Sequence, residues 1–167
     1  MTRASAIDRV VGYFEEGGFQ SDLRELVAYE TESQDPVGAG ELARYLNEAM
    51  VTRLSALGFE CTVNPNPVTG AGPILMARRH EGEELPTLLT YGHGDVIRAQ
   101  TDQWRDGLHP FRMIEDGDRL YGRGTADNKA QHLINLAALD AVLQERGSLG
   151  FNCKVIIETG EEMGSPG

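Results

Sequence analysis

Apolar residues recur along the chain at two spacings, one typical of helices and the other typical of strands. A spacing of three to four residues predicts helices over 5–14, 21–27, 41–57 and 133–143. Short apolar or alternating runs predict strands over 59–63, 74–77, 87–91 and 155–157, and residues 31–40 read as a loop. Asp116-Gly117 predicts a hairpin between 111–114 and 119–121. Because helices alternate with strands, the predicted class is α/β with a largely parallel sheet and a small antiparallel part.

The stretch from Thr90 to Ile97 follows the third predicted strand and contains the first candidate for chemistry. His93 and Asp95 fall just past the end of that strand, which is the edge where open α/β sheets bind ligands. Residues two apart in an extended segment point to the same side, so the Asp95 carboxylate can support the His93 ring. Such support is usual behind a metal-bound imidazole. A lone His-X-Asp is more often only a hydrogen-bonded histidine at a strand end, so further features are needed.

Two further acidic features follow strand or turn endings. Asp127 comes after a glycine-rich turn at a helix start, and Glu161 with Glu162 comes after the apolar run 155–157. Taken singly, Asp127 suits a helix N-cap and the glutamates suit a solvated loop. With His93 at the same sheet edge, they form instead a nitrogen and carboxylate set that favours a divalent cation, zinc first.

Net charge and cysteine content indicate which classes of partner and which cellular compartment to expect. The formal net charge of −11 argues against nucleic acid or an anionic membrane as the main partner, because both need a basic face. Cys61 and Cys153 lie in strand-like runs and are predicted to be buried free thiols of a reducing compartment. The sequence shows neither a signal peptide nor a run long enough to span a bilayer, so a cytoplasmic location is expected.

In combination, these motifs resemble the N-terminal part of the zinc-dependent aminoacylase and carboxypeptidase family. That family includes acetylornithine deacetylase, succinyl-diaminopimelate desuccinylase, glutamate carboxypeptidase and carnosinase. The matching segments occur in the family's order and are 92–96, Trp104 with 110–111, 116–117, 120–124, 127–129 and 161–165. The resemblance implies a three-layer α/β/α catalytic domain with a largely parallel, mixed sheet.

The resemblance also implies a role for each candidate residue. His93 is expected to ligate one zinc ion and Glu162 the other, while Asp127 bridges the two ions. In the catalytic set, Glu161 is expected to be the general base and Asp95 to support His93 from behind. Cobalt or manganese can stand in for zinc in such a site.

Several parts of the family pattern do not occur within residues 1–167. They are a further acidic ligand after the glutamate pair, a histidine close to the C-terminus and an inserted dimerisation domain. We therefore expect this chain to be the truncated N-terminal portion of the catalytic domain of a longer, homodimeric enzyme, and to be inactive alone. The resemblance further implies a cis peptide bond between Asp127 and Asn128.

Other residues near these motifs receive simpler interpretations. His80 is expected at the surface, His109 in a loop, and His132 on a helix surface or in a hydrogen bond. Lys129 begins a helix, where its charge gains nothing from the helix dipole, so its purpose is open.

The expected function is zinc-dependent hydrolysis of an amide bond in a small peptide or an N-acyl amino acid by a metal-activated water. Glu161 would move the proton. A serine mechanism is disfavoured because the sequence has no Gly-X-Ser-X-Gly stretch. Two alternatives remain open. One is a metal-dependent phosphoester hydrolase, since carboxylate clusters also hold Mg²⁺ and Mn²⁺. The other is a non-catalytic binding module of the same fold, against which the base Glu161 argues.

Overall fold

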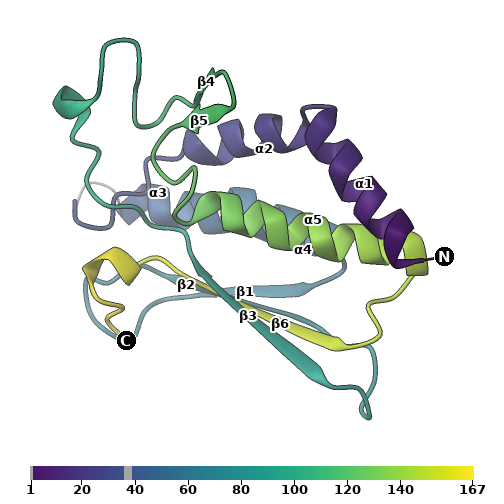
Figure 1. Ribbon diagram of the computed structural model, residues 1–167. Helices are drawn as coiled ribbons and strands as arrows, with labels where there is room; N and C mark the ends of the chain where they lie inside the picture. Colours follow the sequence, from purple (N-terminus) through teal and green to yellow (C-terminus); the bar gives the residue numbers. More distant parts are fainter. Residues whose placement is uncertain (1, 36–38) are drawn as a thin grey trace.

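A four-stranded sheet in the order β1-β2-β6-β3 carries helices on one face in the computed structural model, which describes residues 2–35 and 39–167 (Figure 1). The strands are Glu60–Asn64 (β1), Ile74–Arg79 (β2), Thr87–His93 (β3) and Asn152–Glu158 (β6). β3 and β6 are parallel, and α5 (Lys129–Arg146) lies in the crossover that a parallel pair requires. β2 runs antiparallel to both β1 and β6.

The helices form two tiers above the sheet. α5 and α4 (Val51–Ala56) lie next to the sheet, and α1 (Arg3–Glu15) and α2 (Gly18–Val27) pack over α5 (Figure 1). α4 continues a helix that starts as α3 (Ala39–Arg44) and passes through a π-helical segment, η2 (Tyr45–Met50). The apolar face predicted for this helix is buried except at its end, where Leu57 is only partly buried. The buried members are Leu42, Tyr45, Leu46, Ala49, Met50 and Leu54. Among the described residues, none of the helices combines the length and apolar character needed to cross a bilayer.

Short elements complete the chain. They are the 3-10 helices Thr101–Gln103 (η3) and Glu161–Met163 (η4), and the hairpin strands Ile114–Asp116 (β4) and Arg119–Tyr121 (β5). Gly117 has φ +62°, a backbone conformation that glycine adopts without strain, so the predicted hairpin turn is confirmed. η4 lies three residues beyond the end of β6, and it carries the glutamate pair.

The predicted α/β class with a mixed sheet is confirmed, with two differences in detail. Only one of the three strand pairings is parallel, because residues 65–73 join β1 to β2 without a helix and β6 inserts between β2 and β3. In the described residues the helices lie on one face of the sheet, and the other face exposes Met76, Leu89 and Tyr91. Within the predicted loop 31–40, residues 36–38 lie outside the described residues, and α3 begins at Ala39.

Candidate metal centre

His93 is the last residue of β3, and it is almost fully buried at the carboxyl end of the parallel strand pair. Its backbone amide donates to Asn128 Oδ1 at 3.3 Å. A Cβ atom on the preceding Gly92 would lie 2.8 Å from His132 Nε2 and 2.9 Å from Asn128 Oδ1. Glycine at this position therefore allows the start of α5 to pack directly against the end of β3. This packing brings the segment that contains Asp127 next to His93.

Asp95 is completely buried and contacts both the histidine and the glutamate pair. His93 Nδ1 donates to the Asp95 backbone carbonyl at 3.1 Å and lies 3.4 Å from Asp95 Oδ1. The two carboxylate oxygens accept hydrogen bonds from the backbone amides of Glu161 (3.2 Å) and Glu162 (3.1 Å). The sequence suggested the contact with His93. It carried no signal for the amide bonds, because they join segments that are distant along the chain.

Asp127 faces the opposite nitrogen of the imidazole. Its Oδ1 atom is 2.9 Å from His93 Nε2, while 71% of its side chain remains exposed. α5 begins at Lys129 with Asn128 in the N-cap position, so Asp127 is not the helix cap that its position in the sequence also allowed. The Asp127–Asn128 peptide bond is cis, as the family resemblance implied.

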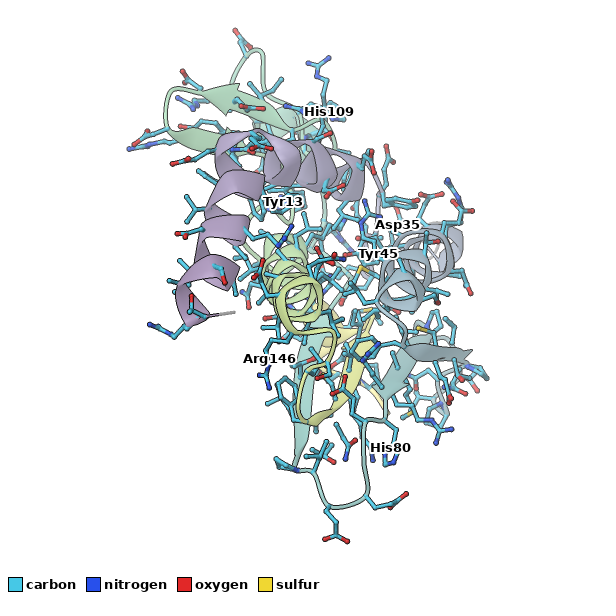
Figure 2. The ribbon with its side chains drawn as sticks, turned by 90° about the vertical axis from the view of Figure 1, so that its right-hand side faces the viewer. Tyr13, Asp35, Tyr45, His80, His109 and Arg146 are labelled. Atoms are coloured by element: carbon cyan, nitrogen blue, oxygen red, sulfur yellow. The ribbon has the colours of Figure 1, made fainter. Side chains whose placement is uncertain are left out.

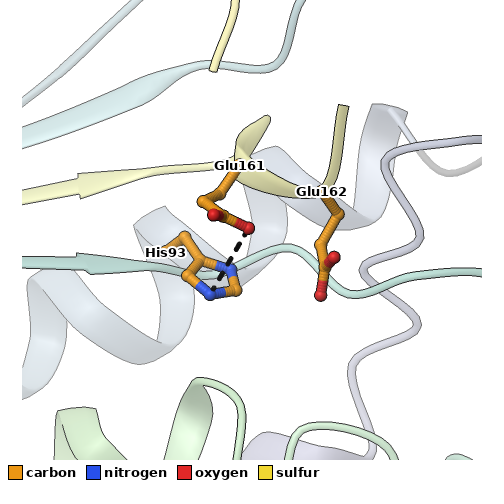
Figure 3. A group of neighbouring side chains, drawn as sticks. All are labelled: His93, Glu161 and Glu162. Carbon is orange, nitrogen blue, oxygen red and sulfur yellow. Dashed lines mark ion pairs between the residues drawn. The ribbon is translucent and has the colours of Figure 1, made fainter. Parts of the chain in front are cut away.

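Glu161 and Glu162 stand beside His93 at the start of η4 (Figure 3). Glu161 Oε2 is 3.9 Å from His93 Nε2. One possible ligand atom from each of these three residues lies within 4.8 Å of the other two. Ligand atoms that share an ion at bond lengths near about 2 Å are separated by similar distances, so the group fits a divalent cation.

The charges of the group also fit a cation. Burial lowers the pKa of His93, but the hydrogen bonds and charges of Asp95 and Asp127 outweigh it and raise that pKa to about 9. Burial raises the pKa of Glu162, and the carboxylates of Asp127, Glu161 and Asp95 raise it further against the opposing effect of His93. Several carboxylates therefore surround one imidazolium, that of His93. A divalent cation would neutralise the same charge and release the imidazolium proton.

The other histidines do not join this group. His80 and His109 lie at opposite ends of the molecule (Figure 2), and His80 is exposed as expected. His132 is buried rather than on a helix surface, and its Nδ1 atom is hydrogen-bonded to the Tyr45 hydroxyl at 2.6 Å. The apolar residues around His132 in the sequence, such as Leu133, were the available signal for this burial.

Comparisons with known proteins agree with the motifs. Residues 89–167 match Peptidase family M20/M25/M40. A cysteinylglycine-S-conjugate dipeptidase of Corynebacterium striatum is 33% identical over 147 residues, which cover 86% of this chain and 30% of the relative. A Beta-Ala-His dipeptidase of Homo sapiens is 33% identical over 157 residues, which cover 88% of this chain and 31% of the relative.

Solved structures extend the similarity to the fold. The crystal structure of human carnosine dipeptidase 1 matches with a TM-score of 0.82 and 30% identity, over 95% of this chain and 35% of that one. An M20 family metallo-carboxypeptidase from Sulfolobus solfataricus matches with a TM-score of 0.73 and 26% identity, over 88% of this chain and 32% of that one. The predicted family resemblance is confirmed. This chain spans about a third of the length of these relatives.

Proposed function

We propose that this chain, whose residues 89–167 belong to the M20/M25/M40 peptidase family, forms the N-terminal part of the catalytic domain of a zinc-dependent amide hydrolase. The proposed substrate is a small peptide or an N-acyl amino acid. Relatives named as dipeptidases and as succinyl-diaminopimelate desuccinylase support this class. The observation that carries the proposal is the convergence of Asp127 and the glutamate pair on His93.

The donor set supports zinc as the metal. In the proposal His93 and Glu162 would each hold one ion, and Asp127 would help to hold both. One imidazole nitrogen with several carboxylate oxygens is a set that zinc accepts in catalytic sites, and cobalt or manganese accept the same donors. When bound, the metal pair would supply an acidified water and a positive charge for the scissile carbonyl.

Glu161 is the proposed general base. Its carboxylate is partly exposed and reaches to 3.9 Å from His93 Nε2, so it borders the space into which the ligands point. From there it would take a proton from the attacking water and return it to the leaving amine.

Asp95 is the proposed positioning residue of this set. It holds His93 on the Nδ1 side, which leaves Nε2 free to face the proposed metal ligand Asp127. It also fixes the backbone of Glu161 through an amide hydrogen bond.

Three further features of the proposal concern the whole protein. We propose a homodimer on the family resemblance alone. A cytoplasmic location is supported by Cys61 and Cys153, which are both free thiols, Cys153 buried and Cys61 partly so. The acidic net charge supports a small-molecule substrate rather than nucleic acid or an anionic membrane as the partner.

The test is a substrate and metal assay on the complete protein. Purified enzyme is offered dipeptides, N-acetyl and N-succinyl amino acids, and a chromogenic phosphoester, and its metal content is measured. We expect bound zinc and cleavage of at least one amide, with activity lost on chelation and restored by added zinc. His93→Ala should lower the zinc content, because it removes a ligand of one of the two ions, and His80→Ala, at an exposed histidine, should leave the zinc content unchanged. Cleavage of the phosphoester alone would refute the proposal in favour of the phosphatase alternative. Zinc binding with no hydrolysis of any substrate would favour the binding module.

A further inference from the structure

Lys129, the first residue of α5, is completely buried, and it takes part in no ion pair within residues 2–35 and 39–167. Its ammonium group donates to the Tyr29 backbone carbonyl at 2.7 Å and lies 5.2 Å from the centre of the Tyr45 ring. Burying an ammonium group without a carboxylate is unfavourable, and the positive end of a helix dipole makes it more so. An apolar side chain would fill the same space without either penalty. The amino group therefore calls for an explanation beyond packing.

The stem of Lys129 lies under the turn that leads to Asp127. A Cβ atom on Gly124 would lie 3.0 Å from Lys129 Cδ and 3.4 Å from Val96 Cγ1. Gly124 has φ +84°, and the turn that contains it runs directly into Asp127. The lysine stem thus supports this turn from the interior of the protein.

The amino group of Lys129 ties the same region to the segment after α2. Tyr29, which accepts its hydrogen bond, lies two residues before Thr31. The Thr31 carbonyl accepts a hydrogen bond from the Val96 amide at 2.8 Å, and Val96 directly follows Asp95. Residues 29–31 therefore hold the start of α5 through Lys129 and the continuation of β3 through Val96.

We propose that Lys129 is a positioning residue that sets Asp127 relative to His93 by anchoring the start of α5 to the Tyr29 carbonyl. The inference rests on the metal-dependent function proposed above. Asp127 Oδ1 is 2.9 Å from His93 Nε2, yet the two residues lie in different segments, Asp127 in the turn before α5 and His93 at the end of β3. A shared ligand must keep its place against both ions, and a mostly exposed Asp127 side chain cannot fix its own backbone. Lys129, two residues after Asp127 in the chain, restrains this backbone through its bond to Tyr29 and does not contact substrate.

Lys129→Met tests the amino group, because methionine keeps most of the stem but has no donor. In the complete enzyme we expect metal affinity, measured by competition with a chromophoric chelator, to fall by about 10–100-fold, as for other supporting residues of metal sites. We expect kcat to fall as well, with little change in KM, because Lys129 does not touch substrate. Lys154→Met is the matched control, because Lys154 is the chain's other lysine and is exposed on β6.

Lys129→Gln provides a second variant, which retains a shorter, neutral donor. Its metal affinity should fall between those of the wild type and Lys129→Met. If both variants fold and keep the metal affinity and kcat of the wild type, or if neither folds, Lys129 serves the core alone and the proposal is overturned. Absence of bound metal in the wild-type enzyme would instead overturn the proposed function itself.

Discussion

Replacing Asp95 by asparagine would test whether one buried carboxylate organises both halves of the candidate site. In the structure its two oxygens accept hydrogen bonds from the Glu161 and Glu162 amides at 3.2 and 3.1 Å, beside His93 Nδ1. Asparagine has the same shape but only one acceptor oxygen. Its NH₂ group would face one of the two backbone amides, donor against donor. The substitution therefore removes one hydrogen bond to a charged acceptor and the negative charge behind His93.

The expected size of the effect follows from those contacts. A hydrogen bond to a charged group contributes about 1.5–3 kcal/mol, and about 1.4 kcal/mol corresponds to a tenfold change. If losing this hydrogen bond displaces Glu161 and Glu162, kcat should fall by about 10- to 150-fold and the metal should bind more weakly. Steady-state kinetics and chelator competition on the complete enzyme measure both effects. Asp118→Asn is the control, because the Asp118 side chain is 98% exposed.

Two outcomes would refute this reasoning. If Asp95→Asn kept the kcat and the metal affinity of the wild type while its melting temperature fell, Asp95 would stabilise the fold without positioning the site. If only KM rose, Asp95 would act on substrate binding, which a completely buried carboxylate behind the histidine should not do.

The remaining predictions concern the base Glu161 and the partly buried Glu81, whose carboxylate supports the fold away from the site. Glu161→Gln should lower kcat by about 10²–10⁴ and keep the metal; loss of metal, with turnover restored by added zinc, would exchange the roles of Glu161 and Glu162. Glu81→Gln should lower the free energy of unfolding by about 1–3 kcal/mol at pH 7, because the Glu81 carboxylate accepts two backbone amides of the α5–β6 connection at 2.8 Å each. Burial raises the pKa of Glu81, but these bonds and a neighbouring arginine lower it overall. This stabilisation is therefore present above the unfolded-state pKa of about 4.3 and is lost as the pH falls through the folded-state value. Chemical unfolding at pH values above and below that transition measures the free energy of unfolding, with Glu84→Gln, at an exposed residue, as the control. If Glu81→Gln were less stable than the wild type by the same amount at every pH, the prediction would be contradicted.

The sequence predicted the local elements well because their signals are local. The apolar face of the helix predicted over 41–57 is largely buried as its spacing indicates, and the hairpin turns at Gly117, directly after Asp116. The order of the strands in the sheet depends instead on contacts between distant segments. Nothing in the periodicity indicates that β6 pairs with both β2 and β3, so the sheet was expected to be more parallel than it is.

The same distinction holds at the candidate site. His93, Asp127 and the glutamate pair follow strand or turn endings, so the sequence could place them at one edge of a sheet. The contacts that support them could not be predicted, because each joins distant segments, as Lys129 joins Tyr29. What the sequence did show was a mismatch, a cation at a helix start where the dipole opposes it. Such a mismatch indicates where a buried tertiary contact has to be sought.

The residues of the candidate site fall into two groups, one buried and held by the protein, the other exposed to solvent. His93 and Asp95 are buried, and their hydrogen bonds are made within the protein, so their geometry needs no metal. Asp127 and Glu161 are exposed, and water can solvate their charges until a cation arrives. If all four were buried, the uncompensated carboxylates would oppose folding. None of the four belongs to the hydrophobic core, which is built from the apolar faces of the helices and the sheet. The fold should therefore survive removal of the metal, and this is why zinc added after chelation is expected to restore activity without refolding.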